Sequence, residues 1–171
     1  MERQAEKRSA IEIVSDFMSS APVDLDAMAR ALGLDVTLDA EIPPDVSGKI
    51  ERVAGGRFRV SINQKHHANR RRFTLAHEIA HYVLHRDLIG TGVTDNAMYR
   101  SANLSDEQEV QANRFAAGLL MPADVVRRKW SEGIRSDAEM AKEFRVSPAA
   151  ARIRIDELRL GKVGFAALKS A

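Results

Sequence analysis

Residues 77–85 contain the side chains best suited to chemistry. His77, Glu78 and His81 form the pattern His-Glu-x-x-His, and His85 repeats the four-residue spacing once more. At about 100° per residue, His77 and His81 lie about 40° apart around a helix, so both imidazoles can reach one ion, with Glu78 beside them. Glu78 can then accept a proton from a water molecule at the ion. The pattern predicts a metal-dependent hydrolytic site; the alternative is a solvated polar helix face that matches by accident.

A helix from about residue 67 to residue 85 can hold these side chains if its other face is buried. The remaining arc of that helix is apolar, and its members are Phe73, Leu75, Ala76, Ile79, Ala80, Val83 and Leu84. This distribution is typical of an amphipathic helix that packs one face and presents the other.

A catalytic zinc ion takes three protein ligands, so a third ligand must come from elsewhere in the chain. The chain contains no cysteine, and no histidine follows His85. A carboxylate is therefore required, and the predicted helix over residues 106–120 offers Asp106, Glu107 and Glu109.

Glu109 is the carboxylate that the helical pattern favours. It borders the apolar stripe of its helix, whereas Glu107 points about 200° away, toward solvent. The small Ala112 and Ala116 would let this helix approach the first one closely. Asn113, one turn beyond Glu109, can hydrogen-bond a ligand imidazole. The alternative for Glu109 is an exposed first-turn glutamate that the helix dipole stabilises.

His85 and Tyr99 are candidates for weaker roles. His85 lies about 80° from His77 around the helix, so we expect it to cap the helix or to support a ligand; a ligand role of its own is the alternative. His85 and Tyr99 are also the candidates to stabilise the negative oxygen that forms during hydrolysis. For Tyr99 the alternative is a buried structural tyrosine.

The composition is that of a globular protein without a membrane span. Of 171 residues, 44% are hydrophobic and 29% are charged, which suits one domain with a small appended module. No apolar stretch approaches the roughly 20 residues that cross a bilayer, and the N-terminal segment lacks the apolar region of a secretory signal. We therefore expect a cytoplasmic protein with no membrane partner.

The remaining pattern predicts an α+β fold in which helices dominate. Residues 34–38 alternate apolar and polar side chains, as a half-buried strand does. Residues 48–53 and 57–63 flank Ala54-Gly55-Gly56 and predict a hairpin. These segments together predict a small antiparallel sheet.

Residues 127–171 predict a separate C-terminal module that resembles a helix-turn-helix. Ser136 begins a capping box and Ser147-Pro148 begins a second short helix. The segment carries 11 lysines and arginines against 6 acidic residues. This excess permits nucleic-acid binding through the module, although a solvated basic helix face is the commoner explanation.

Two separated segments resemble the ImmA/IrrE family of metallopeptidases: RRRFTLAHEIAHYVLH (residues 70–85) and EVQANRFAAGLLMP (residues 109–122). The resemblance extends from about Pro22 to Pro122. It implies a gluzincin-like zinc peptidase domain over residues 1–126, followed by the C-terminal module.

By position, the resemblance implies His77, His81 and Glu109 as Zn²⁺ ligands and Glu78 as the catalytic base. Family members often carry a second glutamate where this chain has Gln111. The implied role is cleavage of a helix-turn-helix repressor, which relieves repression of stress-response or mobile-element genes. The alternative is a metal-binding regulatory module that binds a repressor or DNA without proteolysis. We also expect the strand over residues 57–63 to pair with an extended substrate if its edge is free.

We predict that residues 127–171 bind no specific DNA sequence. In a helix-turn-helix the second helix reads bases from its first turns, and here that stretch is Pro148-Ala149-Ala150-Ala151, without a side-chain donor or acceptor. Fluorescence anisotropy of a fragment of residues 127–171 with DNA at physiological salt checks this. A preference of ~10³-fold for one sequence over random DNA would contradict it.

Overall fold

The computed structural model describes residues 8–90 and 105–162 and confirms the α+β class. Its elements in order are α1 (Ala10–Phe17), α2 (Leu25–Ala31), β1 (Leu34–Asp39), β2 (Gly48–Arg52), β3 (Phe58–Asn63), α3 (Ala68–His85), α4 (Asp106–Leu120), α5 (Ala123–Ser131), α6 (Asp137–Phe144) and α7 (Pro148–Glu157). Short 3₁₀ turns follow β2, α3 and α7. None of the helices within these residues is long and apolar enough to cross a membrane.

The three strands form a mixed sheet in the order β1-β3-β2. The hairpin of β2 and β3 is antiparallel, as expected, but β1 pairs with β3 in parallel, from Leu34 opposite Phe58 to Asp39 opposite Asn63. Successive strands reverse direction along the chain, so a third strand that inserts between the first two must be parallel to β1. The expectation of an entirely antiparallel sheet is therefore corrected.

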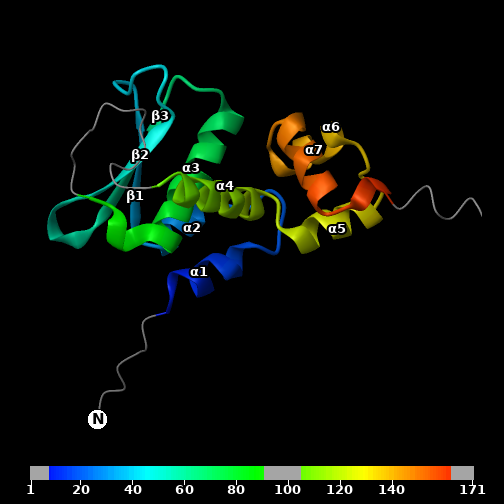
Figure 1. The fold of residues 1–171 in the computed structure, drawn as a ribbon, viewed down its shortest axis with the longest axis horizontal. Coiled ribbons are helices and arrows are strands. Elements are labelled where there is room, and N and C mark those ends of the chain that lie inside the picture. The colour runs from blue at the N-terminus through cyan, green and yellow to red at the C-terminus, as the bar shows by residue number, and fades with distance from the viewer. Residues whose placement is uncertain (1–7, 91–104, 163–171) are drawn as a thin grey trace, which may run out of the picture.

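Helix α3 packs against both the sheet and α4 (Figure 1). Leu75 and Ile79 join Val60 and Ile62 in one hydrophobic core. Ala76 and Ala80 on α3 are completely buried, as are Ala112 and Ala116 on α4. Small side chains allow helix backbones to approach closely. The expected close approach of the two helices is observed.

The C-terminal helices lie across α3 and α4 from the sheet in Figure 1. Ser136 and Ser147 cap α6 and α7 as predicted, with Pro148 in the first turn of α7. Phe144 and Met140 are completely buried in the same core that contains Val60. The side-chain amide of Asn69 on α3 also donates to the Val146 carbonyl at 2.9 Å. The division at residue 126 stays a prediction.

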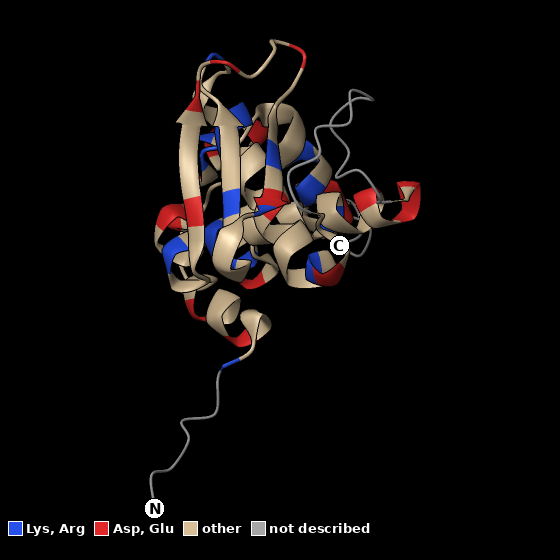
Figure 2. Cartoon of the chain, turned by 90° about the vertical axis from the view of Figure 1, so that its left-hand side faces the viewer, with Lys and Arg blue, Asp and Glu red and all other residues tan. Residues whose placement is uncertain are grey.

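Charged residues of both signs are interspersed over the side of the molecule drawn in Figure 2. Most residues of the central strand β3 are instead buried inside the molecule. Phe58, Val60 and Ile62 are buried on β3, whereas Arg59 between them is exposed.

Gly48→Ala should destabilise the protein, because an added Cβ would lie 2.6 Å from Cγ2 of Thr74 and 2.7 Å from the Ser61 carbonyl oxygen. We expect the free energy of unfolding to fall by about 1–3 kcal/mol, measured by urea denaturation. Gly118→Ala is the matched control: it lies in α4 with only Arg154 within reach, at 3.9 Å. Alanine at position 118 should raise the free energy of unfolding by about 0.5–1 kcal/mol. Equal effects of the two substitutions would contradict the close contact at Gly48.

Candidate metal centre

His77 and His81 lie one turn apart on α3, with their reactive nitrogens turned toward each other. The two Nε2 atoms are 2.9 Å apart. Glu109 reaches both from α4: Oε2 lies 3.3 Å from Nε2 of His77, and Oε1 lies 3.3 Å from Nε2 of His81. The three residues form a group whose ligand atoms all lie within 4.8 Å of one another and could hold a metal ion.

The Oε1 atom of Glu109 is buried and has no hydrogen-bond partner. A buried charged oxygen without a partner is costly unless a cation compensates it. A donor set of two imidazoles and one carboxylate suits a divalent metal. The residues present therefore fit such an ion.

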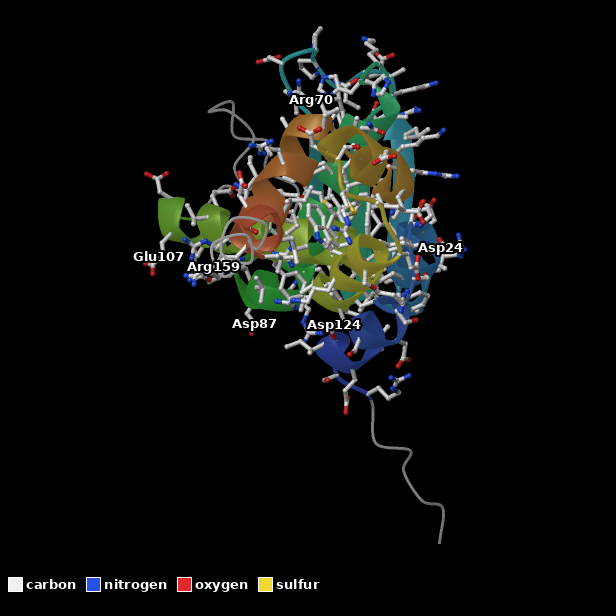
Figure 3. All side chains as sticks on the ribbon, turned by 90° about the vertical axis from the view of Figure 1, so that its right-hand side faces the viewer. Asp24, Arg70, Asp87, Glu107, Asp124 and Arg159 are labelled. Atoms are coloured by element: carbon white, nitrogen blue, oxygen red, sulfur yellow. The ribbon has the colours of Figure 1, made fainter. Side chains whose placement is uncertain are left out.

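Glu107 does not take part in this group. It is exposed at the first turn of α4 and projects away from the rest of the molecule in Figure 3. Asp106 is exposed as well. Of the three acidic candidates on α4, Glu109 is the one that the structure brings to the histidines, as the helical periodicity predicted.

Contacts with the imidazoles keep Glu109 ionised. Close contacts with the imidazoles of His77 and then His81 hold the pKa of Glu109 well below its ordinary value, although burial opposes them. Burial alone would lower the pKa of His77, but the hydrogen bond with Glu109 and the charges of Glu78 and Glu109 raise it overall. Glu109 is thus a carboxylate at neutral pH, as a metal ligand must be.

Glu78 lies beside the metal-binding group and is only 5% exposed. Burial raises its pKa, and the charges of His77 and His81 oppose that rise. A cleft of about 420 Å³ brings Glu78 together with His77, Glu109 and Asn113. A buried carboxyl with a raised pKa in a cleft is suited to accept and release protons.

His85 contacts the far side of His81 and does not line this cleft. Its Nδ1 lies 3.3 Å from Nδ1 of His81, and its Nε2 lies 3.2 Å from Oε1 of Gln111 on α4. This position fits the expected supporting role and not contact with a substrate oxygen. Sequence reasoning missed the partnership with Gln111, because it joins two helices whose relative rotation no local pattern gives.

The expectations for Asn113 and Tyr99 remain. Asn113 lines the cleft beside His77, and its side chain contributes to the raised pKa of that imidazole, in keeping with a place beside a ligand. Nδ1 of His77 is nevertheless buried without a hydrogen-bond partner, so no bond from Asn113 reaches that atom. Tyr99 lies outside the described residues.

Other residues of the cleft were not predicted from the sequence, and Phe73, expected on the packed face of α3, is 38% exposed. Residues 45–48, before and at the start of β2, form one wall, and Arg70, Phe73 and Thr74 extend the wall formed by α3. The four-residue spacing before His77 could have indicated Phe73, which stacks on the His77 ring at a centroid distance of 6.2 Å.

Comparison with known proteins places the chain in a family. The profile of the Peptidase_M78 family, described as the IrrE N-terminal-like domain, matches residues 42–156. No curated protein matches the sequence significantly. A solved structure described as "Mycobacterium tuberculosis transcriptional regulator" is similar, with a TM-score of 0.58 and 18% sequence identity. The match covers 86% of this chain but only 46% of that one, so the chain spans about half the length of its structural neighbour. At 18% sequence identity, this similarity shows a shared fold and nothing further.

We predict one bound divalent ion per chain, held by His77, His81 and Glu109. Glu109→Ala should lose most of the metal, because two imidazoles alone leave the ion without its charged ligand. Glu107→Ala is the matched control and should keep full occupancy. Elemental analysis after dialysis measures both. Full metal occupancy in Glu109→Ala, together with loss of metal in Glu107→Ala, would identify Glu107 as the third ligand instead.

Proposed function

Since the chain belongs to the Peptidase_M78 family, with its IrrE N-terminal-like domain, we propose that it is a zinc-dependent endopeptidase. The proposed substrate is a helix-turn-helix repressor, cleaved in the cytoplasm to relieve repression. The observation that carries the proposal is the convergence of His77, His81 and Glu109 beside the buried Glu78. A structural site would need no buried carboxyl there.

Zinc is the ion that the donor set supports best. Ligand atoms about 2.0–2.1 Å from a tetrahedral zinc ion lie about 3.3 Å from one another. The two histidine nitrogens are 2.9 Å apart, and each lies 3.3 Å from a different oxygen of Glu109, so small shifts of these side chains would reach that spacing. Three protein ligands also match a catalytic site rather than a closed structural site.

Each side chain then has a distinct task in peptide hydrolysis. Zinc, when bound, polarises the scissile carbonyl and acidifies water. Glu78 accepts the proton of the attacking water and later passes it to the leaving amine, a transfer that its raised pKa favours. His85 holds His81 in orientation through its contact with Nδ1, and Gln111 in turn fixes His85.

The substrate backbone would add to β2 rather than to β3. The expectation for the strand over residues 57–63 required a free edge, and this condition is not met, because β3 is central and both of its edges are already paired. Strand β2 is an edge of the sheet, and it begins at Gly48 in the wall of the Glu78 cleft. An extended peptide paired with β2 would therefore enter the cleft.

The second candidate is a regulatory module that binds a repressor or DNA without cutting it. The structural neighbour is described as a transcriptional regulator, which favours a place in gene regulation for either candidate. Direct base reading by α7 is disfavoured, since its exposed Arg152 pairs with Asp156 at 3.3 Å and with Asp137 at 4.0 Å. Catalysis by Glu78 separates the two candidates.

We predict that the protein cleaves a helix-turn-helix repressor, best taken from a neighbouring gene, when zinc is present. Glu78→Gln should retain its metal but lose about 10²–10⁴-fold in rate, because the amide cannot accept the proton. Electrophoresis of timed digests with parallel metal analysis measures both.

Glu107→Gln is the control and should cleave normally, and casein should stay intact if the activity is dedicated to a repressor. Undiminished cleavage by Glu78→Gln would contradict the role of Glu78 as the base. Efficient casein digestion would contradict an activity dedicated to a repressor.

A further inference from the structure

A second cleft, of about 600 Å³, lies between α2, β1 and the start of α3. It shares no lining residue with the Glu78 cleft. We call it the arginine cleft, after Arg30, Arg71, Arg72 and Arg145, which line it.

The four arginines come from three separate elements and exceed the acidic residues beside them. Arg30, Arg71 and Arg145 make no ion pair within the described part of the chain. Asp26 and Asp35 are the acidic residues of the lining, and Asp35 lies 3.6 Å from Arg59. A net positive charge therefore remains, to which the N-terminal end of α3 adds its dipole.

Arg72 has an incomplete set of partners. It is partly buried, and one guanidinium nitrogen donates to the Val23 carbonyl at 2.5 Å, whereas its Nε is buried without a partner. Burial and the neighbouring charge of Arg145 lower the pKa of Arg72, although the charges of Asp26 and Asp24 oppose them. Two like charges held together in this way oppose folding and attract an anion.

Arg145 occupies a backbone position that favours glycine. It caps the end of α6 in the left-handed conformation, with φ 53° and ψ 51°. Glycine adopts this conformation without strain. The structure gives the Arg145 side chain no hydrogen bond within the described residues that would explain its presence. A task in ligand binding would explain it.

The floor of the arginine cleft is apolar, and one side of it is a strand edge that pairs with no other strand in residues 8–90 and 105–162. Leu34, Val36 and Leu38 of β1 line it, and Leu38 is 55% exposed. Strand β1 is the outer strand of the sheet, opposite β2. A free edge offers backbone donors and acceptors to an added strand.

We propose that the arginine cleft binds an acidic, partly apolar segment of the protein substrate, extended along β1. This inference rests on the proposed function, which supplies a protein substrate. Carboxylates of the segment pair with Arg30, Arg71 and Arg145, and an apolar side chain covers Leu38. The apolar floor and the strand edge favour a peptide over nucleic acid, whose phosphates would use only the arginines.

Binding can be tested directly with the full chain carrying Glu78→Gln, so that the probe is not cut. The probe is a fluorescent ten-residue peptide of alternating Glu, Leu, Thr and Val, and its control carries Gln for every Glu. We expect the acidic peptide to bind at least ~10-fold more tightly, with an affinity that falls as salt rises.

Adding Arg145→Gly to this chain should weaken binding of the acidic peptide by ~10-fold, because one charged contact is lost. Glycine suits the left-handed position, so thermal unfolding should show a fold at least as stable as before. Arg135→Gln removes the same charge from an exposed site outside the cleft and should leave binding unchanged. Hydrogen exchange should show new protection at the β1 amides.

Three results would overturn the proposal: equal binding of both peptides, unchanged affinity in Arg145→Gly, or protection at β2 in place of β1. If duplex DNA competed with the peptide, and if its affinity depended more strongly on Arg145, the cleft would be a nucleic-acid site instead.

Cleavage of the repressor by a chain with only Arg145→Gly separates this inference from the proposed function. We expect a lower kcat/KM with unchanged kcat. Unaltered cleavage would reject the docking site but keep the proposed peptidase activity. Peptide binding without cleavage of any repressor would reject the peptidase activity but keep the docking site.

Discussion

The close packing of α3 on α4 is the constraint on which the candidate metal centre depends. Both helices bury alanines without exposed surface, Ala76 and Ala80 on one and Ala112 and Ala116 on the other. Backbones that approach through small side chains hold their remaining side chains at fixed separations. Glu109 therefore reaches 3.3 Å from both ligand histidines, although it is far from them in sequence.

The same packing sets the electrostatics of the site. Glu78 is removed from water by the elements around α3, which raises its pKa, while the nearby imidazoles limit the cost of burying it. Glu109 keeps its charge because the imidazoles of His77 and His81 lie 3.3 Å from its oxygens. Two carboxyl groups close in space thus acquire opposite tendencies, one to hold a proton and one to remain ionised, which is how acid–base and ligand roles are separated.

Helix α3 also lies between two clefts and contributes to both. Its residues Arg70, Phe73 and His77 face the Glu78 cleft, whereas Arg71 and Leu75 face the arginine cleft. The central position of β3 leaves β2 as the strand edge beside one cleft and β1 as the edge beside the other. In the proposed function, a protein substrate would contact the chain at two separate strand edges, one beside Glu78 and one remote from it.

Local patterns in the sequence were enough to predict α3, α4, α6 and α7 and to bring together His77, His81 and Glu109, although they did not predict α5. Residues on one helix keep fixed angles to one another, so spacing alone placed His77 beside His81, and the absence of cysteine left Glu109 as the carboxylate at the edge of a buried stripe. Three features emerged only when the chain was folded: the parallel pairing of β1 with β3, the contact of His85 with Gln111, and the gathering of arginines from α2, α3 and the α6–α7 turn. Each of these joins segments distant in the chain, and their relative position is set by core packing, which no local period encodes.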